Sequence, residues 1–192
     1  MKYTLIVIAI LQLSIFGCSS NPKVPTEPEV VASPVPTGTP LAGSGEITLN
    51  PIEYYTTAQE RTIIKQAEKK LNEVKKSKCV HDFLSQRKMI QTQGKTSEQV
   101  ADNIASLGGL VDVVMYYSRF SSAVAYRQPP ELKINLNRKY FYAELPVCDW
   151  VSTILHESLH ALANYEHDYQ WNAQRDYSVP YSANFAIDAC CK

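Results

Sequence analysis

A proline-rich stretch near the N-terminus limits how much of this 192-residue chain can fold. Residues 21–45 contain six prolines and three glycines, with only five sizeable apolar residues among them. Such a segment cannot bury enough surface to offset its ordering entropy, so we expect an extended, polyproline-like tether. The globular part is therefore expected over residues 51–192, a length suited to one domain.

The first 17 residues have the proportions of an export signal. Lys2 precedes an apolar run over residues 5–11, which is too short to span a bilayer comfortably. Gly17 directly before Cys18 resembles a bacterial lipoprotein signal, in which the cysteine is lipidated and becomes the mature N-terminus. The same resemblance associates Ser19, in place of Asp, with the outer membrane. An ordinary secreted protein with a cysteine near its cleavage site is the alternative.

Three segments follow from these features: a signal peptide over 1–17, lipidated Cys18 with the tether over 18–50, and the globular domain over 51–192. We expect this domain in the bacterial cell envelope, lipid-anchored at the outer membrane and facing the periplasm or the cell surface. The formal net charge is zero, which argues against a nucleic-acid partner, and the hydrophobic content of 45% is ordinary for a globular protein.

The first half of the domain has the pattern of two helices. Thr57 and Glu60 form a capping-box pattern, and apolar residues follow at helical spacing, which predicts a helix over 57–78. A second helix is predicted over 97–107, where Gly108 and Gly109 stop it. Alternating apolar and polar residues then predict three strands, over 110–118, 122–127 and 132–137. This layout indicates an α+β fold with N-terminal helices and a small, mostly antiparallel sheet.

A helix near the C-terminus carries the strongest chemical signal. Asp149 is suited to cap it, and His156-Glu157-Ser158-Leu159-His160 lies within it, an H-E-x-x-H motif. Four residues make slightly more than one turn, so both imidazoles project from one face and can bind one metal ion. Glu157 lies about 100° around the helix from His156, within reach of a metal-bound water.

His167 is the natural third ligand for a catalytic zinc ion, which keeps one position for water. The chain must turn sharply after the helix to bring this residue back to the metal. Asn164 suits that turn because asparagine tolerates the left-handed conformation. Glu166 is the competing third ligand.

These residues resemble the zincin metallopeptidases, and within them the metzincins, which carry H-E-x-x-H-x-x-G-x-x-H. Ala163 stands at the glycine position, Glu166 stands where the family has its third histidine, and His167 follows one residue later. A one-residue extension of the helix, with Asn164 as the turning residue, would reconcile the spacing. The resemblance implies a zincin-like fold with an active-site helix.

The metzincin methionine turn is absent, because all three methionines lie upstream of the motif. Its place is taken by residues 176–181, which resemble the Ser-Val-Pro-Tyr floor loop of metzincin-like bacterial secreted peptidases. Within this loop Tyr181 can offer its hydroxyl to the metal or to an oxyanion, with a plain packing role as the alternative. The resemblance covers roughly residues 131–187, including Asn137-Arg138-Lys139-Tyr140 upstream of the motif, and is at motif level elsewhere.

Four cysteines remain besides Cys18, an even number that suggests two disulfides in an exported domain. Adjacent Cys190 and Cys191 rarely pair with each other, so Cys79 and Cys148 are each expected to take one of them. Which takes which stays open.

We therefore expect a zinc-dependent metallopeptidase that hydrolyses peptide bonds with a zinc-activated water and Glu157 as general base. Its ligands would be His156, His160 and His167, and its substrate a peptide or protein of the envelope. Two alternatives stay open. One is a non-catalytic structural or assembly lipoprotein with a degenerate or structural metal site, and the other is a zinc amidase acting on cell-wall peptides.

Overall fold

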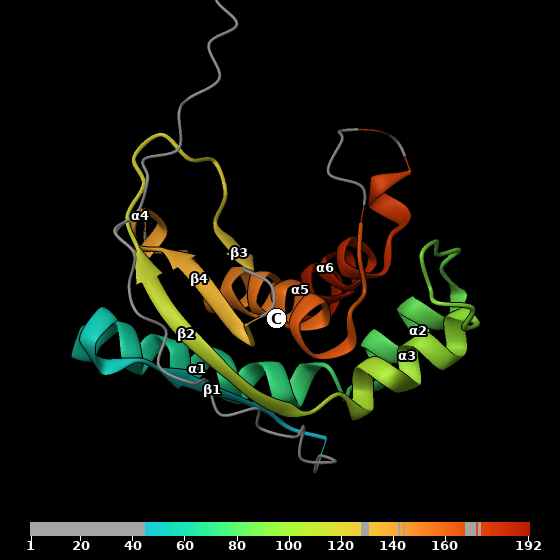
Figure 1. Ribbon diagram of the computed structural model, residues 1–192. Helices are drawn as coiled ribbons and strands as arrows, with labels where there is room; N and C mark the ends of the chain where they lie inside the picture. Colours follow the sequence, from blue (N-terminus) through green and yellow to red (C-terminus); the bar gives the residue numbers. More distant parts are fainter. Residues whose placement is uncertain (1–44, 128–130, 142, 144, 168–171, 173) are drawn as a thin grey trace, which may run out of the picture. The chain divides into compact units, whose positions relative to one another are not determined.

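The computed structural model describes residues 45–127, 131–141, 143, 145–167, 172 and 174–192 (Figure 1). Over these residues the chain is α+β, with six α-helices and one four-stranded sheet. The strands are β1 (Ile47–Pro51), β2 (Gly109–Tyr116), β3 (Ala125–Arg127) and β4 (Lys133–Asn137). The helices are α1 (Ala58–Val74), α2 (Lys78–Gln86), α3 (Ser97–Ser106), α4 (Arg138–Phe141), α5 (Val147–Ala163) and α6 (Val179–Cys190), with 3-10 turns η1 (Glu53–Tyr55) and η2 (Arg175–Tyr177).

The expected signal peptide, Cys18 and the tether up to residue 44 lie outside the described residues. Within the part of the chain that is described, no helix is long and apolar enough to cross a membrane. Strand β1 begins at Ile47, so the last residues of the segment expected as tether belong to the sheet.

The sheet is mixed, and the expectation of a mostly antiparallel sheet is wrong. Its strand order is β1-β2-β4-β3, in which β1 and β4 both run parallel to β2 and only β3 is antiparallel to its neighbour. The long connection through α1, α2 and α3 returns the chain to the same end of the sheet, which makes β1 and β2 parallel. Alternation of apolar residues predicts strands but carries no information on their direction.

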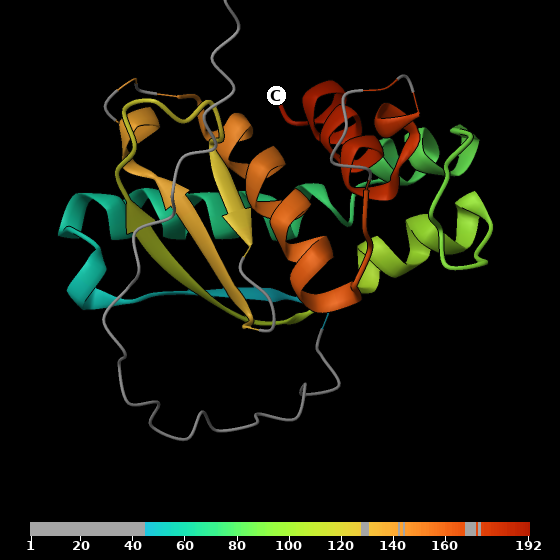
Figure 2. The ribbon, with the colours of Figure 1, turned by 45° about the horizontal axis from the view of Figure 1, so that its top comes forward.

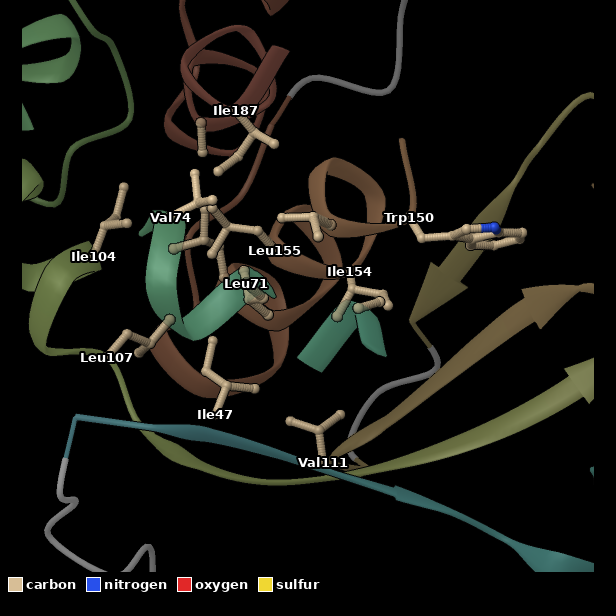
Figure 3. Close-up of a cluster of buried hydrophobic side chains, with 14 of the residues drawn as sticks. Ile47, Leu71, Val74, Ile104, Leu107, Val111, Trp150, Ile154, Leu155 and Ile187 are labelled. Atoms are coloured by element: carbon tan, nitrogen blue, oxygen red, sulfur yellow. The ribbon is translucent and has the colours of Figure 1, made fainter. Parts of the chain in front are cut away.

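The hydrophobic core lies between the sheet and helices α1 and α5, which also pack against each other. Figures 1 and 2 show α5 running between the sheet and α6. Figure 3 shows apolar side chains from helices and strands converging on this core. They include Leu71 and Val74 of α1, Ile154 and Leu155 of α5, and Ile47 and Val111 of the strands, all buried.

The helix predictions hold best where a cap residue is present. Thr57 caps α1 and Thr96 caps α3, and each forms a reciprocal capping box with the residue three positions on. The predicted helix over 57–78 is, however, interrupted after Val74, and Ser77 caps the separate helix α2. Asp149 does not cap α5, which begins after Pro146; its carboxylate lies in the first turn, where it favours the helix dipole.

Both expected disulfides are present, and the structure settles their pairing. Cys79 of α2 bonds Cys190, and Cys148 at the start of α5 bonds Cys191. The two adjacent cysteines therefore tie the end of α6 to two different helices. These links restrict the unfolded chain and stabilise the arrangement of α2, α5 and α6.

Lys75 is a buried cation at the junction of α1, α3 and the start of the described domain. Its side chain is 1% exposed, and its three donors meet three backbone carbonyls, those of Gly45 at 2.7 Å, Leu107 at 2.8 Å and Ala105 at 2.9 Å. Burial lowers the pKa of this amine to about 8, so it stays protonated at neutral pH. An ammonium group is well matched to the unpaired carbonyls at the end of α3.

We expect Lys75→Met to reduce the free energy of unfolding by about 2–4 kcal/mol, because it strands buried carbonyls without a donor. Chemical denaturation at pH 7 measures the change. Lys76→Met is the matched control, since Lys76 is exposed and forms a loose ion pair with Glu46 at 3.8 Å. That control is expected to stay within about 0.5 kcal/mol of the wild type; an equal loss in both variants would contradict the proposed role of Lys75.

Candidate metal centre

Helix α5 serves both as a core helix and as the carrier of the histidine pair. Leu155 and Leu159 are fully buried in the core, whereas His156 and His160 project together from another face of the helix. Their ring centroids are 5.0 Å apart. Both imidazoles are buried, at 7% and 6% exposure, so the helix holds them in a site with little solvent.

The end of α5 makes the turn that the sequence predicts at Asn164. This residue has φ 52° and ψ 29°, the left-handed conformation that asparagine tolerates. The side chain of Gln93 donates hydrogen bonds to the carbonyls of Ala163 and Asn164, both at 2.9 Å. The helix end is therefore closed by the turn residue and by a side chain from a distant loop.

The turn also fixes the proton on one histidine. Nδ1 of His160 lies within hydrogen-bond distance of the carbonyl oxygen of buried Tyr165. A carbonyl only accepts, so Nδ1 carries the proton and Nε2 keeps its lone pair for a metal. The Tyr165 hydroxyl in turn accepts a hydrogen bond from Asn103 of α3 at 2.9 Å. Outer partners of this kind orient metal-binding histidines.

The structure brings His167 to the pair, and the three candidate ligand atoms lie within 4.8 Å of one another. Ring centroids of His167 lie 5.1 Å from His156 and 4.8 Å from His160. Glu166, the competing ligand, instead places its carboxylate 3.9 Å from Nδ1 of His160, the nitrogen that bonds Tyr165. Of the two candidates, only His167 joins the group that can hold a metal.

Electrostatics keep the imidazoles in the form that binds metals. Burial, followed by the charges that neighbouring histidines would carry, lowers the pKa of His160 to about 4 and that of His156 well below its usual value. Both rings are therefore neutral at pH 7, as metal coordination requires. Three histidines that converge on one point fit a zinc ion with one open position.

Tyr181 lies beside the histidine group. It belongs to the first turn of α6, and its ring centroid lies 4.8 Å from that of His156 and 5.0 Å from that of His167. The guanidinium group of Arg175 stacks on the Tyr181 ring, with its central carbon 4.4 Å from the ring centroid. Of residues 176–181, Tyr181 lines the cleft, and the floor-loop role of this segment stays a prediction.

Arg87 fixes the start of α6 from outside the site. Its guanidinium donates hydrogen bonds to the Ser182 hydroxyl at 3.1 Å and to the Asp176 carbonyl at 3.0 Å. It also lies 4.8 Å from the Phe185 ring centroid. Nothing in the local sequence marked Arg87, because its partners lie about ninety positions further along the chain.

Glu157 is buried next to the histidines, and its burial favours the protonated form of its carboxyl group. Burial raises the pKa of its carboxyl group to about 7, against a lowering by a backbone hydrogen bond from Arg127 and by the Arg127 charge. A carboxyl group with a pKa near 7 can both take and release a proton at neutral pH.

The three histidines, Glu157 and Tyr181 all line a cleft of about 540 Å³. Residues 122–127 line one side, α5 contributes the motif, and Tyr181 and Arg175 line the opposite side. The cleft therefore lies along β3, the edge strand of the sheet. Arg127 and Arg175 also line the cleft. Neither was predicted from the sequence, because an isolated arginine belongs to no recognisable motif.

Comparison with known proteins adds no family to this geometry. No protein-family model matches the chain, and no curated protein matches it. The function proposed below therefore depends on the chemistry of the site residues themselves.

Because its pKa is raised, Glu157 is expected to lower the free energy of unfolding of the metal-free domain as pH rises. The unfolded carboxyl ionises near 4.5 and the folded one near 7, so the loss grows between these values and is complete above 7. Glu157→Gln, with chelator present, is expected to be more stable than the wild type by about 2–3 kcal/mol at pH 8 and equal to it below pH 4.5. Urea unfolding at several pH values measures this difference.

Glu60→Gln is the control with the opposite sign. Although burial alone would raise the pKa of Glu60, its 2.6 Å bond to Arg138 and its cap contacts lower it. A lowered pKa stabilises the fold above the unfolded pKa and loses that effect as pH falls, so Glu60→Gln is expected to destabilise at pH 8. If Glu157→Gln and Glu60→Gln changed the free energy of unfolding in the same way across this pH range, the explanation given for the Glu157 pKa would be refuted.

Proposed function

We propose that the domain is a zinc metallopeptidase of the bacterial cell envelope, anchored by a lipid on Cys18. One observation carries the proposal: three histidines converge on one point next to buried Glu157, inside a cleft. The resemblance to zincins in the H-E-x-x-H motif supports the same reading. A structural zinc site would normally have four protein ligands, and the described residues place three candidate ligands together here.

Each residue has a defined role in this proposal. His156, His160 and His167 would hold the metal through neutral ring nitrogens. When bound, zinc supplies Lewis acidity, which acidifies water and polarises a carbonyl group. The Glu157 carboxylate takes the proton from the attacking water and passes it to the leaving amine nitrogen. The Tyr181 hydroxyl would donate a hydrogen bond to the oxyanion that develops on the substrate.

Strand β3 gives the cleft a wall that suits an extended peptide. It is the edge strand of the sheet, and residues 122–127 line the cleft directly. A peptide in extended conformation can add to such an edge through main-chain hydrogen bonds. We therefore propose peptide segments of envelope proteins as the substrate.

The test begins with metal analysis of the purified domain and continues with proteolysis of a mixed peptide pool, scored by mass spectrometry. We expect one zinc per chain and cleavage by the wild type. Glu157→Gln is expected to retain zinc and to lose activity by about a hundredfold or more, since it keeps shape but cannot accept the proton. Glu98→Gln, on α3 and outside the cleft lining, is the matched control and is expected to cleave normally.

The third ligand is tested by single replacements at adjacent positions. His167→Ala is expected to weaken zinc binding by about a hundredfold or more, whereas Glu166→Ala changes it little. Competition with a chromogenic chelator measures both affinities. A large loss in Glu166→Ala alone would transfer the ligand role to Glu166.

The two alternatives are outcomes of the same assay. Cleavage of peptidoglycan fragments, with no cleavage of the peptide pool, would indicate the amidase. Zinc binding with no Glu157-dependent activity on any substrate would indicate the structural lipoprotein.

A further inference from the structure

Arg127 lies in the cleft with donor capacity that the described residues do not use. Its side chain is 13% exposed, and Nε is buried with no hydrogen-bond partner among the described residues. Arg127, Glu157 and His160 line the same cleft, so this side chain lies in the cleft that holds the proposed catalytic group. A buried guanidinium with an unused donor is an expensive feature unless an acceptor joins it at some stage.

Glu166 is the acidic group nearest to this guanidinium, and the pair is loose. Nη1 of Arg127 lies 4.0 Å from Oε1 of Glu166, beyond hydrogen-bond distance, and the Glu166 side chain is 56% exposed. Half-exposed pairs of this length contribute little. Another carboxylate can therefore take the position next to Arg127 without breaking a strong bond.

The charge of the cleft favours an anionic ligand. Its charged lining residues are Arg127, Arg175, Glu157 and Glu166, two of each sign. A divalent metal on the histidines then leaves the cleft positive, and like-charged peptide side chains are disfavoured there.

We propose that Arg127 is a specificity residue that binds a substrate carboxylate close to the scissile bond. This inference rests on the proposed peptidase function and narrows its substrates to peptides with an acidic side chain, or a free C-terminus, at one position near the cut. The planar guanidinium presents Nε and Nη together, a geometry that matches a carboxylate in two parallel hydrogen bonds.

Experiment can distinguish carboxylate binding by the Arg127 side chain from a structural role of this residue. The hydrogen bond to Glu157 comes from the backbone of Arg127, so a side-chain replacement leaves that bond in place. Loss of the side-chain charge changes Glu157 equally for every substrate. The ratio of Kd values for a glutamate and a glutamine peptide therefore reports on binding by Arg127, separately from its effect on Glu157.

The experiment uses acetylated, amidated Ala/Ser octapeptides with one Glu at each position in turn, and their Gln counterparts. An all-Ala/Ser octapeptide as free acid and as amide separates a C-terminal carboxylate from an acidic side chain. Two quantities are measured for every pair: the ratio of kcat/KM for the zinc-loaded protein, and the ratio of Kd by calorimetry for chelator-treated protein, which does not depend on turnover.

For the wild type we expect about tenfold preference for the carboxylate at one position, in either the side-chain or the C-terminal arm. Arg127→Gln is expected to abolish the preference, Arg127→Lys to keep part of it, and Glu166→Gln to increase it by a few-fold. Arg119→Gln is the matched control, because Arg119 is exposed and outside the cleft lining.

The outcomes separate this inference from the proposed function. Cleavage with equal Glu and Gln ratios in wild type and Arg127→Gln overturns the role of Arg127 and leaves the peptidase standing. Arg127-dependent preference in Kd without any cleavage upholds the carboxylate site and overturns the peptidase. If no peptide binds and none is cleaved, both are overturned.

Discussion

The hydrogen bond from His160 Nδ1 to the carbonyl oxygen of Tyr165 joins the histidine pair to the chain that returns after helix α5. It fixes the tautomer of His160 so that Nε2 is the free nitrogen. It also requires the chain to reverse immediately, which the left-handed Asn164 achieves. His167 reaches the site only because this reversal occurs within a few residues. A metal centre built on one helix and its own C-terminal turn follows from this contact.

Helix α5 is constrained from several directions at once, and these constraints make the site rigid. Its apolar face lies in the core, and the bond from Cys148 to Cys191 links its first turn to the end of α6. The other end of α6 carries Tyr181, which contacts the histidine rings. The disulfide thus closes a frame around the histidine group, with His156 and His160 on one helix and Tyr181 on the other.

Local sequence predicts those parts of the structure whose cause is local. The capping boxes at Thr57 and Thr96, the histidine pair one turn apart and the turn at Asn164 all depend on residues within a few positions of each other. The cysteine pairing followed in part from geometry, since adjacent cysteines rarely bond. What escaped prediction depends on distant contacts: the direction of the strands, strand β1, the break between α1 and α2, and the cleft arginines. A buried lysine such as Lys75 belongs to the same class, because its three acceptors come from remote segments.

Burial of Glu157 links stability to the chemistry that we propose. The same desolvation that raises the pKa of its carboxyl group to about 7 makes its ionised form costly to the fold. Arg127 opposes this effect through its backbone and its charge, so one residue of the edge strand both lowers the pKa of Glu157 and lines the cleft. A substrate carboxylate that bound Arg127 would weaken that opposing charge and raise the pKa of Glu157 further, which makes the carboxylate a stronger base but leaves less of it ionised at neutral pH. Substrate recognition and proton transfer would then be coupled through a single guanidinium.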